Sequence, residues 1–177
     1  MRKGIGLICL ILMLLIGCTN KIDFAEEKPF VKLELYSASQ GTYLDHFPKN
    51  ITVSNDGSVQ LYTEEVVDRL GDVELKVGED APIVKKKISA KKVEEIKDVI
   101  EENNFFSIPE DVTDYGVMDG GGSTITVYEK EQERKVGGEN SRNEQYNAIE
   151  KIIFEQVREE YYDWEKETRE YLFELNE

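Results

Sequence analysis

The chain has 177 residues, with 22 Lys and Arg against 37 Asp and Glu, and its formal net charge at pH 7 is −15. This acidity argues against nucleic acid as a partner, because phosphate binding needs a basic face. It also argues against a domain that lies flat on an anionic lipid leaflet, since like charges repel. The length suits one domain with a hydrophobic core, and nine Tyr and seven Phe argue against a wholly disordered chain.

The N-terminus has the layout of a secretory signal. Arg2 and Lys3 supply positive charge, and residues 5–16 form an apolar run interrupted only by Gly6. A positive start followed by a short apolar run is typical of such a signal. The run is too short to cross a bilayer as a helix, which takes about 20 apolar residues.

The end of this run, Leu15-Ile16-Gly17-Cys18, resembles the lipobox of bacterial lipoproteins. The resemblance implies that residues 1–17 are removed as a signal peptide and that the Cys18 thiol carries a diacylglycerol group. The new amino group can then be acylated as well. Two acyl chains suffice for stable attachment, whereas one is marginal. The implied location is the extracytoplasmic face of the cell membrane, with the lipid anchor as the contact to the membrane.

An uncleaved signal anchor, or ordinary signal cleavage with Cys18 as an incidental thiol, is the alternative. Under the lipoprotein interpretation, Cys9 is removed and Cys18 is lipidated, so the mature domain has no free thiol and no disulfide. Thiolate catalysis and cysteine-based metal sites are then excluded. We expect no cofactor and no metal.

The mature chain is expected to divide into two parts. Residues 18–29 form the lipidated N-terminus and a polar tether, which reaches roughly 35 Å when extended, and residues 30–177 form a single domain. Residues 30–36 alternate apolar and polar side chains, which predicts a strand. An Asn-Asp-Gly turn at 55–57 predicts a hairpin, because these residues tolerate positive φ. The strands of this hairpin and the remaining predicted strands are 51–53, 59–62, 73–77, 83–88, 124–128 and 134–136.

Helical spacing of Val93, Ile96 and Ile100 predicts an amphipathic helix over residues 90–103, with Ser89 as its N-cap. Three residues after this helix are predicted to fill the core: Phe105, Phe106 and Ile108.

The glycine-rich residues 120–123 are expected to form a flexible loop, because a phosphate-binding loop would need a preceding strand and a following Gly-Lys-Ser/Thr. From Asn143 to Leu175, apolar residues recur at steps of three or four, which predicts one long helix. Its first part is expected to pack on the sheet. The pattern leaves open whether the last turns, residues 161–175, pack on the domain or project.

This order of elements predicts an α+β fold, with a two-layer antiparallel sheet, an amphipathic helix and a long C-terminal helix. Over residues 30–157 the order resembles small α+β lipoprotein domains of uncharacterised function. More loosely, it resembles small proteinaceous protease inhibitors of bacteria. Neither resemblance transfers a catalytic residue to this chain.

Candidates for catalytic or metal chemistry are few. His46 is the sole histidine and follows Asp45, but no Gly-x-Ser-x-Gly elbow accompanies it, so we interpret it as a solvated loop residue. Asp56-Gly57 and Asp119-Gly120 do not meet the spacing of a calcium-binding loop and are interpreted as turns. The basic cluster of Lys85, Lys86, Lys87, Lys91 and Lys92 either contacts anionic headgroups or is simply solvated.

A stripe on the C-terminal helix is the candidate partner-binding surface: Tyr161, Trp164, Tyr171 and Leu172. Exposed aromatic residues mark binding sites, and packing of the stripe on the domain is the alternative. The predicted function is therefore a lipid-anchored, non-catalytic binding or interaction domain for an unidentified protein or small molecule. The alternatives are an inhibitor or modulator of an extracellular enzyme such as a protease and, less favoured, a hydrolase with an unrecognised carboxylate site.

Overall fold

The computed structural model describes residues 21–27, 29–37, 47–64, 66–70, 73–117 and 120–175. The predicted signal segment, the lipobox-like residues ending at Cys18, His46 and Asp119 lie outside the described residues. Within the described ranges, no helix combines the length and the apolar composition that crossing a membrane requires.

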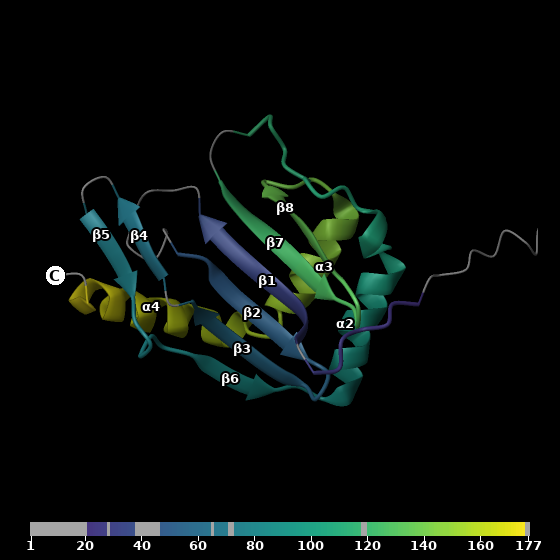
Figure 1. Cartoon of the computed structure of the whole chain (residues 1–177), viewed down its shortest axis with the longest axis horizontal. Helices are drawn as coiled ribbons and strands as arrows, with labels where there is room; N and C mark the ends of the chain where they lie inside the picture. The colour runs from purple at the N-terminus through teal and green to yellow at the C-terminus, as the bar shows by residue number, and fades with distance from the viewer. Residues whose placement is uncertain are drawn as a thin grey trace, which may run out of the picture.

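A six-stranded antiparallel sheet forms the centre of the fold, with the strand order β6-β3-β2-β1-β7-β8 (Figure 1). A separate two-stranded antiparallel sheet, β4-β5, lies at one end. The predicted α+β class is confirmed. The strands of both sheets are β1 (Pro29–Ser37), β2 (Lys49–Ser54), β3 (Ser58–Thr63), β4 (Val66–Leu70), β5 (Val73–Val77), β6 (Val84–Lys87), β7 (Gly121–Tyr128) and β8 (Glu133–Glu139).

The predicted hairpin is confirmed as β2 and β3. At its turn, Gly57 has φ +81°, and a Cβ there would lie 2.4 Å from the Ile88 carbonyl oxygen. Glycine is therefore required both by the backbone conformation and by the close approach of the next segment. The carboxylate of Asp56 accepts hydrogen bonds from the Ser58 amide and hydroxyl, each 2.9 Å long. These bonds and Lys87 lower the pKa of Asp56 to about 2.

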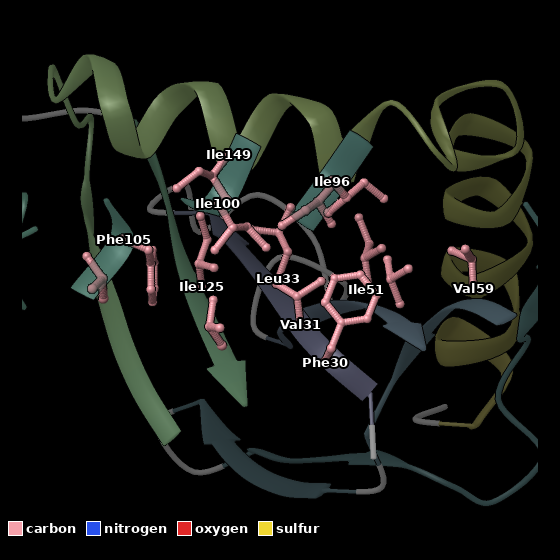
Figure 2. Packing of buried hydrophobic residues seen from close by; sticks show 14 of the residues in the cluster. Phe30, Val31, Leu33, Ile51, Val59, Ile96, Ile100, Phe105, Ile125 and Ile149 are labelled. Carbon is pink, nitrogen blue, oxygen red and sulfur yellow. The ribbon is translucent and has the colours of Figure 1, made fainter. Parts of the chain in front are cut away.

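Three helices lie on one side of the large sheet: α2 (Ala90–Glu102), α3 (Glu144–Phe154) and α4 (Arg158–Leu175) (Figure 1). Ser89 caps α2 as predicted, since its hydroxyl accepts from the Lys92 amide. Figure 2 shows α3 over the sheet, with Ile149 of this helix and Ile96 and Ile100 of α2 packed toward Leu33. Each such buried side chain stabilises the fold by about 1.5–3 kcal/mol.

The residues after α2 complete this core. Phe105 and Ile108 are buried, as predicted, while Phe106 is only partly buried and meets the Phe105 ring edge-on. A short 3-10 helix, η2 (Phe105–Ser107), holds the two rings in place.

Two expectations about the strands are wrong. Gly121 and Gly122 are not in a flexible loop but begin β7, where they pair with Ser37 and Tyr36. A Cβ on Gly122 would lie 2.4 Å from the Tyr36 ring, so the glycine allows this ring to lie across the strand. Residues 66–70, for which no strand was predicted, form β4 and pair with the predicted strand β5.

The prediction of a polar tether over residues 18–29 is wrong for residues 22–27, because these residues belong to the domain. Ile22 is buried in the main core, and its amide donates to Glu101 Oε1 at 3.0 Å. The Phe24 ring packs edge-on against Phe30 at 5.4 Å, and the Ala25 amide donates to the Tyr128 carbonyl. This segment is polar on average, and the apolar residues within it pack against parts of the domain that are distant in the sequence.

The predicted long C-terminal helix is present as α4, but the prediction that it runs unbroken from Asn143 is wrong, because the chain turns between α3 and α4. The amides of Gln156 and Val157 bond back to the carbonyls of Ile153 and Phe154, three residues earlier, which tightens and ends α3. Val157 is fully buried at the turn, so the apolar spacing continues through it. Figure 2 shows the two helices meeting at an angle, which lets α3 cover the sheet and α4 extend toward β5.

Candidate ligand-binding site

The helix-facing side of the sheet changes from apolar to polar toward the end where β1 finishes. In the middle of the sheet, Leu33 pairs with Ile51 and Ile125. Two residues further along β1, Leu35 pairs with Lys49 and Ser123. Because side chains alternate along a strand, these residues face the same side as the core. Lys49 is 5% exposed and Ser123 is 3% exposed, so two buried polar side chains flank Leu35 where the core ends. Lys49 and Ser123 are called the polar row below.

Helix α3 starts beside this polar row. Asn143 caps it by accepting from the Tyr146 amide at 2.9 Å. The Tyr146 hydroxyl lies 2.7 Å from Ser123 Oγ, and both groups are buried. Burial raises the pKa of Tyr146 far above its usual value, so the phenol stays neutral and can act as a hydrogen-bond donor. The next turn of the helix brings Asn147 and Glu150 to the edge of the row.

A pocket of about 400 Å³ opens where the polar row meets α3 and α4. A shallower hollow of about 380 Å³ adjoins it and shares Leu35, Glu150 and Tyr161 with it, so the two form one groove. The size is within the range of small-molecule sites, about 300–1,000 Å³. The pocket is lined by Leu35, Tyr36, Lys49, Gly121, Gly122, Ser123, Gly138, Asn140, Ser141, Asn147, Glu150 and Tyr161.

Hydroxyl and amide groups dominate this lining, with Lys49 and Glu150 as the two charged side chains. The Tyr161 ring contacts the Phe154 ring edge-on at 5.1 Å, which gives the groove an aromatic wall. Such a lining can hydrogen-bond a small molecule that carries hydroxyl or amide groups, while the wall packs against the molecule's apolar surface. Within the described part of the chain, no group of three or more His, Cys, Asp or Glu is placed to hold a metal ion.

The structure separates the four predicted partner-binding residues. Tyr161 lines the groove, but Trp164 is buried, and its Nε1 donates to the Pro82 carbonyl at 2.8 Å. Leu172 is fully buried in a second cluster against β5, and Tyr171 packs on the same cluster. The alternative of packing is therefore confirmed for Trp164 and Leu172, and the expectation that they form an exposed stripe is wrong.

The basic cluster is largely paired with neighbouring acids. Lys86 lies 2.6 Å from Glu160, and Lys87 lies 3.1 Å from Asp56. Lys92 likewise lies 2.8 Å from Glu95. These pairs favour the interpretation of the cluster as a solvated surface. Three of its lysines lie on β6, an edge strand, where charged side chains discourage pairing with other chains.

The other face of the large sheet carries no helix in the described part of the chain (Figure 1). Lys32, at its centre, pairs with Glu64 at 2.6 Å and with Glu34 at 3.5 Å. Burial alone would lower the pKa of Lys32, but the two carboxylates raise it. Three partly buried tyrosines share this face: Tyr36, Tyr62 and Tyr128.

Sequence reasoning missed Lys49, Ser123, Asn147 and Glu150. A signal was present for the first two, because Lys49 is in phase with the apolar residues of its strand, and Ser123 is in phase with those of β7. No protein-family model and no curated protein sequence matches this chain. The assignment of the site therefore depends on its geometry and chemistry.

Proposed function

We propose that the protein is a lipid-anchored extracytoplasmic lipoprotein whose α+β domain binds a small hydroxyl- or amide-bearing molecule in the pocket beside α3. The lipobox-like segment ending at Cys18 supports the anchor. One observation supports the binding role: the apolar core ends in a buried polar row that opens into a cavity of about 400 Å³. A pocket with a few fixed hydrogen-bonding groups on its wall can orient a bound molecule, as is typical of small-molecule sites.

The proposed role is binding, not catalysis. The Ser123 hydroxyl, the one serine oxygen of the buried row, is hydrogen-bonded to the Tyr146 phenol. A neutral phenol does not activate a serine as a general base would. The pocket groups instead act as hydrogen-bond donors and acceptors around a ligand.

Titration of a soluble Cys18→Ser form, without its signal segment, tests the pocket. Monosaccharides, disaccharides and dipeptides serve as probes, and amide chemical shifts are the readout. We expect the shifts of Gly121, Gly122 and Asn147 to move, and Ser141→Trp, which fills the pocket, to weaken binding by at least about tenfold. Gln132→Trp, at the separate hollow beside the β7–β8 turn, should bind as the parent does. Shift changes confined to the opposite sheet face would contradict the proposal.

The anchor has its own test. Cys18→Ser in the full chain should abolish incorporation of radiolabelled palmitate and move the protein out of the membrane fraction, or leave it as unprocessed precursor. Unchanged membrane attachment together with unchanged electrophoretic mobility would refute the lipoprotein assignment.

The helix-free face of the sheet favours a second candidate, a modulator of an extracellular enzyme. Tyrosines are enriched at protein interfaces, and Tyr62 and Tyr128 are partly exposed on this face. Inhibition of an enzyme in a panel of extracellular proteases, lost in Tyr62→Ala but kept in Ser141→Trp, would favour this candidate over the pocket.

A further inference from the structure

The segment that joins the domain to Cys18 is much shorter than the tether that the sequence predicts. Ile22 is part of the main core, so only residues 19–21 separate it from Cys18. Four residue steps span at most about 14 Å, because an extended chain advances about 3.3–3.6 Å per residue. The domain therefore has little freedom to move away from a lipid attached at Cys18.

Several independent contacts hold this segment on the domain. Lys130 forms an ion pair with Asp23 at 3.1 Å, and the Lys130 amide donates to the Asp23 carbonyl at 3.0 Å. The Asn55 side-chain amide donates to the Ala25 carbonyl. The Lys97 ammonium lies 5.6 Å from the centre of the Phe24 ring. These contacts reach three different parts of the domain, so the segment is fixed relative to the sheet.

The anchor point and the pocket lie at opposite ends of the same strands. Strand β1 begins at Pro29, just after the docked segment, and ends at Ser37, beside the pocket. Strand β7 begins with the pocket glycines and ends at Tyr128, whose carbonyl accepts from the Ala25 amide. Nine residues of strand extend about 27 Å. In Figure 1, the docked residues 21–27 lie on the right, and the last turns of α4 lie at the left end.

We infer that the domain stands on the membrane in one orientation, with its anchor end against the lipid headgroups and its pocket facing away from them. The anchor end consists of residues 21–27, the last turn of α2 and the β7–β8 turn. This inference rests on the lipid anchor of the proposed function. It adds a defined membrane-facing surface and places the pocket where a ligand arriving from solution reaches it.

The anchor end carries many carboxylates, including Asp23, Glu26 and Glu131. Such a surface is repelled by anionic lipids. The orientation therefore comes from the short covalent connection and the docked segment, not from attraction of the protein surface to the bilayer. A longer connection should abolish it.

Two positions on β8 offer a matched pair for measuring the orientation. Glu133 and Glu139 are both exposed, and they lie at the anchor end and the pocket end of the same strand. They are separated by roughly 20 Å of strand. In the lipidated protein the Cys18 sulfur is blocked, so a cysteine introduced at either position is the single reactive thiol.

The experiment uses the full lipidated protein in phosphatidylcholine vesicles that contain a headgroup spin label. Glu133→Cys and Glu139→Cys each carry the same fluorophore, and quenching is read only on protein that floats with the vesicles. We expect quenching to be several-fold stronger at Glu133→Cys. A flexible twelve-residue insertion between Asn20 and Lys21 should remove the difference.

Equal quenching at the two positions, or stronger quenching at Glu139→Cys, would overturn the inference while leaving the lipid anchor intact. A difference that survives the insertion would also overturn it, since the surface and not the short connection would then set the orientation. Failure of the protein to float would instead contradict the anchor itself, so the two proposals fail in different ways.

Discussion

At the proposed binding site, two residues depart from the apolar and polar alternation of the strands. Lys49 and Ser123 occupy inward positions that the alternation of β2 and β7 assigns to apolar side chains. The Ser123 hydroxyl shares a hydrogen bond with the Tyr146 hydroxyl, and the neighbouring glycines, Gly121 and Gly122, bring the backbone to the pocket wall. Buried polar residues at such positions lower the stability that an apolar row would give. A binding role therefore explains why Lys49 and Ser123 are polar at these inward positions.

The ionisation of Asp56 is expected to make the stability of the fold depend on pH. Hydrogen bonds from Ser58 and Lys87 lower its pKa from 3.8 to about 2, so the folded state prefers the charged form. This carboxylate stabilises the fold above pH 3.8, and the contribution is lost as the pH falls toward 2. Asp56→Asn should therefore lower the thermal midpoint near neutral pH, and the gap to the parent should close in acid.

Thermal unfolding followed by circular dichroism from pH 7 down to pH 2.5 measures this gap. Glu131→Gln, an exposed residue of the β7–β8 turn, controls for the loss of one negative charge. A gap for Asp56→Asn that stays constant down to the lowest pH would contradict the assignment of the effect to ionisation.

At the scale of elements, the turn between α3 and α4 determines what the C-terminal residues do. Helix α3 lies on the sheet beside α2, whereas α4 extends to β5 and buries Leu172 with Phe47, Val77 and Ala81. This second cluster joins the two-stranded β4-β5 sheet to the rest of the molecule. One face of the last turns of α4 therefore packs on the domain, and the other face is exposed.

A matched pair of leucines on α4 tests this arrangement. Leu172 is fully buried, and Leu175 is 44% exposed. Leu172→Ala should lower the free energy of unfolding by about 2–5 kcal/mol, because it leaves a cavity in the second cluster. Leu175→Ala removes the same atoms from the surface and should cost at most about 1 kcal/mol. Urea unfolding measures both, and equal costs would show that α4 does not pack as described.

For the whole molecule, net charge opposes compactness. The chain carries a formal charge of −15, because its 37 acidic residues outnumber its 22 basic residues. Self-repulsion of this kind keeps a protein soluble but destabilises the folded state. The fold is held against it by the core between the sheet and the helices.

Screening this repulsion should stabilise the protein. Raising sodium chloride from about 0.01 M to about 0.5 M shortens the Debye length from about 30 Å to a few ångströms. The thermal midpoint of the soluble Cys18→Ser form should therefore rise by several degrees in calorimetry. A flat or falling midpoint would mean that the surface ion pairs outweigh the net repulsion.

Much of the fold could be predicted from the sequence, because the signals for its elements are local. The Asn-Asp-Gly turn, the Ser89 cap and the alternation of β1 each depend on atoms within a few residues. The site could not be predicted in this way. Its walls come from β1, β2, β7, β8, α3 and α4 and from the residues between β8 and α3. Their meeting depends on the register of the sheet and on the turn at Val157.

The α+β class, the acidic composition and the lipobox-like segment at Cys18 can all be recognised from composition and short-range patterns. The burial of Ile22, Trp164 and Leu172, and the opening of the polar row into a pocket, become visible only in the folded domain. This difference arises because burial is a property of pairs of surfaces. An apolar or aromatic side chain has the same spacing in the sequence whether it packs or projects, and its distant partners determine which of the two occurs.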